Sequence, residues 1–389
     1  MKWSYLFLAF WAMLVLGLAD NIRGPIFPDL LREFHLTDGR GSLFFMCASA
    51  CGLGINIASV WWLKRWGPLR GLKIFQISMS LGLLLISFSH GLWGLFAGAA
   101  FIGFSFGGVG ITQNILIAWG ATSEMRRKSY ATLHAIYGLA SLSAPLVLIV
   151  VYHFQWRWQS AFLLIACLSL LVNFWSFFVS PHRDDPQYPE TSFRHAHTPL
   201  KTIYWFAALN SFYVVAELLI GTRLVLLARR EWGMGASEAN QLLSLFYLLL
   251  LGGRLVMSFW HFKAKTKTLM SISILLSLLL FTIGAFTHPL IIALCGLPMS
   301  IFYPCSMALT YEEQPKGADN IIAWTLTLNA GAVMAMHWLV GWISDLASLK
   351  IAILVGPLSL LLGFSLLLTE KFFIPGETAK NAQKNTQKS

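Results

Sequence analysis

Apolar blocks of about 20 residues recur along the whole chain, and each is long enough to cross the roughly 30 Å hydrocarbon core of a bilayer as a helix. Charged residues make up 12% of the 389 residues, against about 25% in soluble domains. The blocks are continuous and lack the two-residue alternation of barrel strands. We therefore predict an all-α integral membrane protein and exclude a soluble enzyme.

Polar breakers divide the apolar sequence into twelve predicted transmembrane helices. These cover residues 3–28, 41–63, 71–89, 92–119, 130–153, 158–179, 202–228, 239–262, 269–286, 290–311, 321–344 and 347–368. A polar segment with four prolines and three histidines separates the sixth span from the seventh. We predict an N-terminal six-helix bundle over residues 1–180, a cytoplasmic linker over 181–199, a C-terminal six-helix bundle over 200–370 and a cytoplasmic tail over 371–389.

Positive charges are distributed unevenly between the two ends of the predicted spans. Of 28 lysines and arginines, 19 fall on the side that holds both termini and six on the opposite side. The positive-inside rule predicts cytoplasmic termini, in a multi-pass protein of the inner or plasma membrane. Because the basic residues sit in short loops, the net charge of +11 does not predict binding to nucleic acid. The five cysteines lie in apolar segments, so we predict no disulfide framework, metal site or cofactor.

Polar residues recur at similar positions in the two halves of the chain. Similar residues recur at a nearly constant offset of 195 to 200 positions, in the pairs Lys2 and Lys201, Asp20 and Glu217, Arg23 and Arg223, Lys64 and Lys263, and His134 and Asn329. This pattern indicates six spans duplicated in parallel, as two six-helix pseudo-repeats. Secondary transporters of this arrangement rock their halves about a central cavity.

Charged side chains lie inside the first span of each predicted half, Asp20 and Arg23 in one and Glu217 and Arg223 in the other. An unpaired ion in the membrane costs at least about 2.5 kcal/mol, so each needs a partner or an aqueous cavity. In a structural interpretation, Asp20 pairs with Arg23 and Glu217 with Arg223, or Arg23 snorkels outward. In a functional one, Asp20 or Glu217 carries a proton, with an affinity set by burial and the nearby arginine. The glycine and prolines after Arg23 predict a helix break at this level.

Other polar residues inside the spans are candidates for binding a substrate. Each has the alternative role of an interhelical hydrogen bond. Together with Arg23 and Arg223, the candidates are Asn21, Gln113, Asn114, Asn210, Tyr213, Tyr303 and Asn329. His337 is a further polar residue within the eleventh span.

Several short strings resemble those of a known family. The segment Leu63-Lys64-Arg65-Trp66-Gly67-Pro68-Leu69-Arg70 resembles the basic loop between spans two and three of the major facilitator superfamily, with Lys64 where the family has an acid. The strings at residues 213–217, 252–255 and 296–304 look like those of its fucose, galactose and glucose proton symporter branch. The resemblance implies the major facilitator fold and a cytoplasmic gate loop that includes Lys64, Arg65, Gly67 and Arg70.

The resemblance further implies alternating access, a midplane site built from spans one, four, seven and ten, and a carboxylate that couples transport to protons. The leading hypothesis is a monomeric secondary transporter in which Asp20 or Glu217 couples the movement of a small polar, sugar-like solute to protons. One alternative is an organic anion, a carboxylate or phosphate ester, clamped by Arg23 and Arg223. Another is efflux of an amphipathic compound. The chain has no nucleophile motif or phosphate-binding loop, so an enzyme is not predicted.

Overall fold

The computed structural model describes residues 1–181, 199–259, 264–314 and 317–373. These residues form helices joined by short connections, in the order α1 (Trp3–Asn21), α2 (Arg23–Glu33), α3 (Asp38–Ile57), α4 (Ser59–Ser87), α5 (Leu92–Gly120), α6 (Ser123–His153), α7 (Gln159–Phe177), α8 (Leu200–Glu231), α9 (Ala236–Phe259), α10 (Thr266–Phe286), α11 (Pro289–Leu294), α12 (Gly296–Glu313), α13 (Ala318–Leu346), α14 (Leu349–Ala352), α15 (Val355–Leu368) and α16 (Glu370–Phe373).

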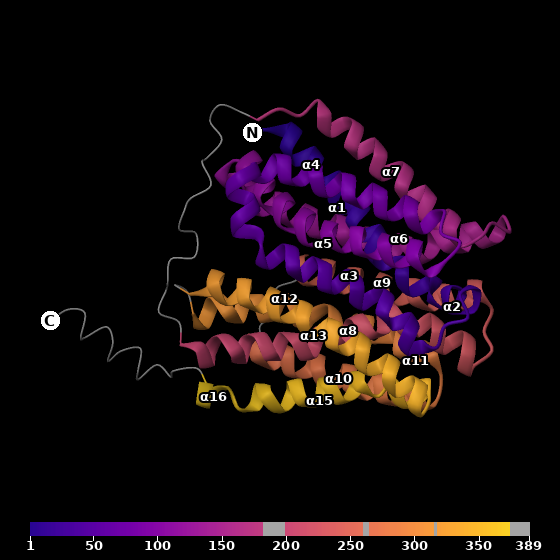
Figure 1. Cartoon of the computed structure of the whole chain (residues 1–389). Helices are drawn as coiled ribbons and strands as arrows, with labels where there is room; N and C mark the ends of the chain where they lie inside the picture. The colour runs from indigo at the N-terminus through magenta and orange to yellow at the C-terminus, as the bar shows by residue number, and fades with distance from the viewer. Residues whose placement is uncertain (182–198, 260–263, 315–316, 374–389) are drawn as a thin grey trace.

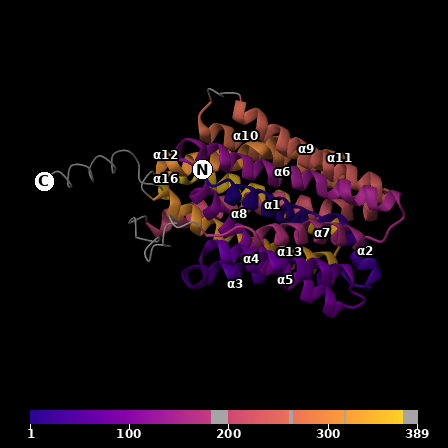
Figure 2. The same cartoon turned by 90° about the horizontal axis from the view of Figure 1, so that it is seen from above.

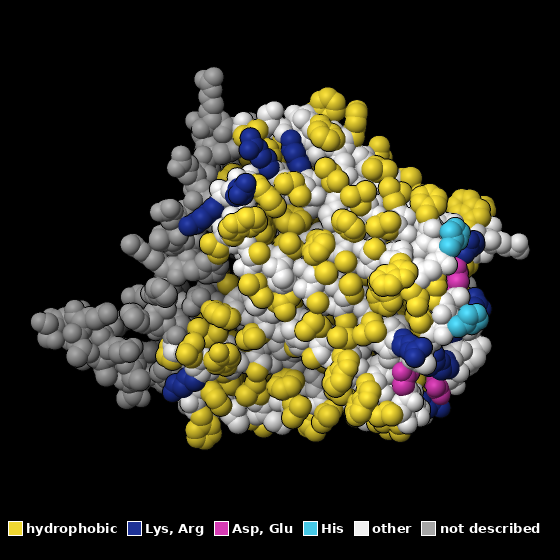
Figure 3. Space-filling view, in the orientation of Figure 1, with side chains coloured by type: hydrophobic (Ala, Val, Ile, Leu, Met, Phe, Trp, Pro, Cys, Tyr) yellow, Lys and Arg dark blue, Asp and Glu magenta, His cyan; other side chains and the backbone are white. Residues whose placement is uncertain are grey.

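The prediction of an all-helical membrane protein is confirmed. Within the described residues, twelve helical spans are long and apolar enough to cross a bilayer. Figure 3 shows apolar side chains over the middle of one face, with charged side chains gathered toward its two ends. Exposed apolar residues such as Phe174, Leu279 and Leu358 are therefore the surface that meets lipid.

Two predicted boundaries differ from the structure, and backbone chemistry explains both. The first span breaks at Ile22, ahead of the prolines, because Pro25 lies in the first turn of α2, where its missing N–H is not needed. The predicted loop of residues 64–70 is shorter in the structure: it is confined to a break at Gly67, where two helical stretches of α4 meet and the backbone is not helical. Gly67 has a φ of 69°, a left-handed conformation that glycine adopts without steric cost.

The helices of the first and second halves of the chain lie on opposite sides of the molecule. In Figure 1, α1 and α4 to α7 occupy the upper part, and α8, α10, α13 and α15 the lower part. The start of α1 and the short α16 lie at the same end, at the left in Figures 1 and 2. We call this the terminal end, and the opposite end, which holds α2, the distal end. The predicted linker and tail lie mostly outside the described residues, and the bundle boundaries stay predictions.

Ion pairs join the two halves at the distal end. Arg229 of α8 donates to both oxygens of Asp29 on α2, at 2.7 and 3.2 Å. The neighbouring Arg230 donates to both oxygens of Asp38 at the start of α3, at 2.6 and 2.8 Å. Further hydrogen bonds across the same seam involve Thr37, Gly39, Ser344 and Asp345. Bidentate arginine–carboxylate pairs of this kind fix geometry as well as charge, so they hold the distal end closed.

A glycine contact lies next to this network. Gly24 of α2 faces Gly221 of α8 so closely that a Cβ on Gly24 would overlap the Gly221 carbonyl oxygen. The two glycines are 197 residues apart, the same offset that separates Asp20 from Glu217. The two glycines meet where α2 packs against α8. Any larger side chain here pushes the halves apart.

We predict that Gly24→Val shifts the protein away from the closed distal end. Spin labels placed at Arg40 and Lys350, on opposite halves, should show longer distances by pulsed electron paramagnetic resonance than in the parent protein. The labels require a background in which the five cysteines are replaced. Gly252→Val is the matched control, because a Cβ at Gly252 meets no neighbouring atom within 4 Å. Identical distance distributions in the two valine variants would contradict the steric role of Gly24.

Candidate functional site

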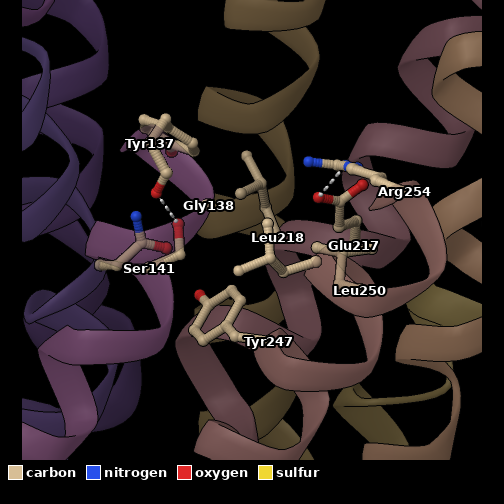
Figure 4. A pocket seen from close by; sticks show the side chains of 10 residues that line it. Tyr137, Gly138, Ser141, Glu217, Leu218, Tyr247, Leu250 and Arg254 are labelled. Atoms are coloured by element: carbon tan, nitrogen blue, oxygen red, sulfur yellow. Dashed lines mark hydrogen bonds and ion pairs between the residues drawn. The ribbon is translucent and has the colours of Figure 1, made fainter. Parts of the chain in front are cut away.

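A polar cavity lies between α1, α6, α8 and α9, so both halves contribute to it. Its volume is about 30 Å³, so the cavity is small in this conformation. Its polar lining residues are Asn21, Tyr137, Ser141, Glu217, Tyr247 and Arg254. Its remaining lining residues are Gly138, Leu218, Leu250 and Leu251. Figure 4 shows Tyr137 and Ser141 on one side and the pair of Glu217 and Arg254 on the other, with Leu218 and Tyr247 between them.

On the N-terminal half, Asp20 lies directly behind the cavity wall. The hydroxyl of Tyr137 donates to its Oδ2 at 2.6 Å, and Arg23 forms an ion pair with its Oδ1. The Asp20 side chain keeps 24% of its surface exposed, so its carboxylate is not sealed from solvent. The neighbouring Asn21 lines the cavity and donates to the carbonyl of Gly17. The expected pair of Asp20 and Arg23 is thus formed, with Tyr137 as a link to the cavity.

On the C-terminal half, Glu217 faces the cavity and pairs with Arg254 of α9, at 3.4 Å. The alternative pair of Glu217 and Arg223 is not formed. Arg223 lies two turns farther along α8 and its Nη2 donates to Ser42 of α3 at 2.8 Å. Six positions along a helix correspond to about 600°, so the two side chains point in directions about 120° apart around α8.

Helical spacing brings these side chains to the cavity. Tyr137 and Ser141 are four residues apart on α6, and the Ser141 hydroxyl donates to the Tyr137 carbonyl at 2.9 Å. On α9, the lining positions Tyr247, Leu250 and Arg254 follow the spacing i, i+3 and i+7, which is one face of a helix. The cavity therefore has one wall from each of four helices, and its polar groups converge from both halves.

Asn114 and Gln113, the predicted candidates of the fourth span, make contacts within the N-terminal half and are not among the residues that line this cavity. Gln113 is buried and donates to the sulfur of Met13 at 3.1 Å. Asn114 donates to the carbonyl of Gly110, one turn earlier in α5, at 2.7 Å.

The predicted candidates of the C-terminal half also lie outside the cavity lining. Asn210 accepts a hydrogen bond from Ser306, and Asn329 accepts one from Ser211, at 2.9 and 2.8 Å. The hydroxyl of Tyr213 donates to the carbonyl of Met299 at 2.6 Å. These contacts are interhelical hydrogen bonds, the alternative role weighed for each residue. Tyr303 is partly buried against the core of the same half.

The predicted gate loop lies at the bend of α4. Lys64, Arg65 and Arg70 are exposed around Gly67, and the guanidinium of Arg65 lies over the ring of Trp61 at 6.0 Å. These cations are therefore available at the surface of the molecule.

Sequence reasoning missed four of the polar lining residues, Tyr137, Ser141, Tyr247 and Arg254. Arg254 could have been predicted, because a charged residue inside a predicted span requires a carboxylate partner. The two tyrosines and the serine could not have been predicted, because single hydroxyl groups in apolar helices are common.

Comparisons with known proteins agree with this architecture. The sequence profile of the Major Facilitator Superfamily matches residues 9–320. A solved D-xylose-proton symporter is similar with a TM-score of 0.80 and 12% identity, over 96% of this chain and 98% of that chain. An inward-facing, occupied bacterial homolog of the human lysosomal transporter Spinster gives 0.74 and 12%, over 95% and 97%. The transporter FucP in the outward conformation gives 0.61 and 17%, over 94% and 99%.

One curated relative is similar over a shorter stretch. The tetracycline resistance protein, class B, of Escherichia coli is 30% identical over 126 residues, which are 32% of this chain and 31% of that protein. The match thus spans about a third of that relative. The profile match over most of the sequence and the twelve-span helical fold lead to one conclusion: the chain belongs to the Major Facilitator Superfamily of membrane transporters.

Proposed function

We propose that the protein moves a small polar, sugar-like solute through the central cavity by proton-coupled alternating access. The observation that carries this proposal is the pair of carboxylates at equivalent positions of the two halves, Asp20 and Glu217, each held by an arginine beside one cavity. Both groups are acids that exchange protons, and both lie inside membrane-spanning helices, where a change of charge alters the local energy by several kcal/mol.

The cavity lining supports a neutral, hydroxyl-bearing solute. Asn21, Ser141 and the tyrosine hydroxyls offer uncharged donors and acceptors, and the arginine of the lining is already paired with Glu217. Leu218, Leu250 and Leu251 give the cavity an apolar side, which suits the C–H surface of a ring. An anion clamped by Arg23 and Arg223 has less support at this cavity, because neither arginine is among its lining residues.

Proton binding gives each ion pair two states. When the carboxylate is ionised, it neutralises the charge of its arginine. When the carboxylate is protonated, the arginine donates instead to another acceptor, such as a solute hydroxyl or water. Tyr137 adds a hydroxyl between Asp20 and the cavity, at hydrogen-bond distance from the carboxylate. Occupation of the cavity and protonation of Asp20 or Glu217 are therefore coupled through shared hydrogen bonds.

The closed distal end supports a conformation in which the cavity faces the terminal end. With the predicted cytoplasmic termini, in the inner or plasma membrane, the distal end is extracellular and this conformation faces inward. The higher TM-score with an inward-facing neighbour than with the outward FucP agrees with that assignment. We expect the transporting unit to be the monomer, since both walls of the cavity come from one chain.

A second candidate function is efflux of an amphipathic compound. The local identity with a tetracycline resistance protein favours it. The leucines of the lining suit an apolar ring system. The two candidates differ in the ligand that the cavity holds, so ligand binding separates them.

We predict that a neutral sugar raises the thermal stability of the detergent-purified protein, whereas phosphate esters and amphipathic drugs leave it unchanged. A ligand at 100 times its dissociation constant stabilises by about 2.7 kcal/mol, which a thermal shift detects. The shift should disappear in Ser141→Ala and persist in Thr282→Ala, whose hydroxyl bonds within α10. Stabilisation by a drug and by no sugar would favour efflux.

We predict that Asp20→Asn or Glu217→Gln abolishes proton-driven accumulation of the stabilising solute in proteoliposomes but retains solute exchange. The amides keep the shape of the side chain and cannot release a proton. Glu33→Gln is the matched control, because Glu33 lies at the distal end and bonds Arg157, Trp158 and Gln159. Accumulation at the parent level in both Asp20→Asn and Glu217→Gln would overturn proton coupling through these groups.

A further inference from the structure

A second group of buried polar side chains lies apart from the cavity, between α2, α3, α8 and α13. We call it the Phe45 cluster and define it as Arg23, Phe27, Phe45, Arg223 and His337. The guanidinium carbons of Arg23 and Arg223 lie 5.4 and 4.8 Å from the centroid of the Phe45 ring. His337 stacks on the same ring at 4.6 Å, and Arg223 also lies 4.3 Å from the centroid of Phe27. The cluster thus gathers two guanidiniums and an imidazole around one aromatic side chain.

The cluster has an excess of positive charge. Arg23 has Asp20 as its carboxylate, but Arg223 donates only to the Ser42 hydroxyl at 2.8 Å and the Thr222 carbonyl at 3.3 Å. Among the described residues, no carboxylate lies within ion-pair distance of Arg223. Asp38, which lies nearby, is already paired with Arg230. Removing an unpaired charge from water is costly, so a buried guanidinium with two neutral partners calls for a counter-ion.

Two polar atoms of the cluster lack hydrogen-bond partners. Nη1 of Arg23 and Nδ1 of His337 are buried and contact no acceptor or donor in the part of the chain that the structure describes. Arg23, Arg223 and His337 are only 6%, 1% and 2% exposed. Because buried polar atoms in folded proteins are nearly always satisfied, Nη1 of Arg23 points to a ligand that accepts hydrogen bonds, and Nδ1 of His337 donates to the same ligand in the tautomer that carries its proton there.

We propose that the Phe45 cluster binds a small monovalent anion, either a halide or the carboxylate of a small organic acid, between Arg23, Arg223 and His337. Guanidinium forks match planar carboxylates and also hold halides, and the rings of Phe27, Phe45 and Phe106 give the anion weakly polar walls. A single negative charge neutralises Arg223, whereas a doubly charged phosphate carries a larger desolvation cost. The site does not rest on the proposed solute, because Arg223 and His337 are outside the cavity lining.

Arg23 connects the anion site to Asp20. The carboxylate of Asp20 neutralises Arg23, so it competes with the anion for the same guanidinium. Replacing Asp20 by asparagine removes that competition and leaves both guanidiniums without a carboxylate. The anion therefore binds more tightly in Asp20→Asn than in the parent protein. General loosening of the fold has the opposite effect, which separates the two explanations.

The test is equilibrium binding of radioactive chloride to the purified transporter in sodium gluconate, whose anion is too large for the cluster. We expect saturable binding that weakens by at least about tenfold in Arg223→Gln and strengthens several-fold in Asp20→Asn. Arg157→Gln is the matched control, because it also removes one guanidinium but from an exposed ion pair with Glu33. Its affinity should equal that of the parent.

Competition by formate and acetate identifies the source of the anion. Displacement of chloride by formate at lower concentration assigns the site to a carboxylate, and displacement by bromide alone assigns it to an inorganic halide. If Arg223→Gln does not fold, Arg223→Lys replaces it, and we expect retained chloride binding with weakened formate competition, because lysine lacks the planar fork. Absent chloride binding in the parent, or equal binding in the parent and Arg223→Gln, would overturn the proposal.

Discussion

Charge inside a membrane has to be neutralised close to where it lies, and the organisation of this transporter depends on that constraint. The two halves each place a carboxylate and an arginine at the level of the cavity, in the pairs of Asp20 with Arg23 and Glu217 with Arg254. Because each pair stays within its own half, the alternating access that we propose moves the halves without separating these charges. The cavity therefore keeps its acids in every orientation of the halves.

The ion pairs of the distal end, in contrast, join residues of different halves. Arg229 with Asp29 and Arg230 with Asp38 cross the seam between the halves, so opening that end has to break them. Arg229 and Arg230 keep 19% and 43% of their side-chain surface exposed, whereas Asp29 and Asp38 keep only 5% and 7%, so opening this end has to bring the two carboxylates into contact with water. The pairs beside the cavity each join residues of one half, whereas the distal pairs join residues of different halves. The distal pairs therefore stabilise this conformation, and the pairs beside the cavity do not depend on it.

The sequence predicts some of this directly. Twelve spans follow from the apolar blocks, and the Asp20–Arg23 pair follows from a spacing of three residues on one helix. The partner of Glu217 lies on another helix, 37 positions along the chain, and no local spacing reveals it. Several predicted ligands are instead satisfied locally. Asn21, Asn114 and Asn210 each donate to the backbone carbonyl four residues earlier, a bond that every helix offers to a buried amide and that no sequence pattern separates from a solute contact.

The contact of Gly24 with Gly221 has a consequence for the speed of the transport cycle. Where large side chains interdigitate across an interface, separating the surfaces requires rotamer changes and forfeits many dispersion contacts at once. At the contact of Gly24 with Gly221, neither residue has a side chain that could interdigitate. The halves can then roll over one another at this point with little activation energy, and the closed state depends on the surrounding ion pairs for its lifetime. In the transport cycle that we propose, opening the distal end therefore has to break these ion pairs and meets little steric resistance at the helix crossing.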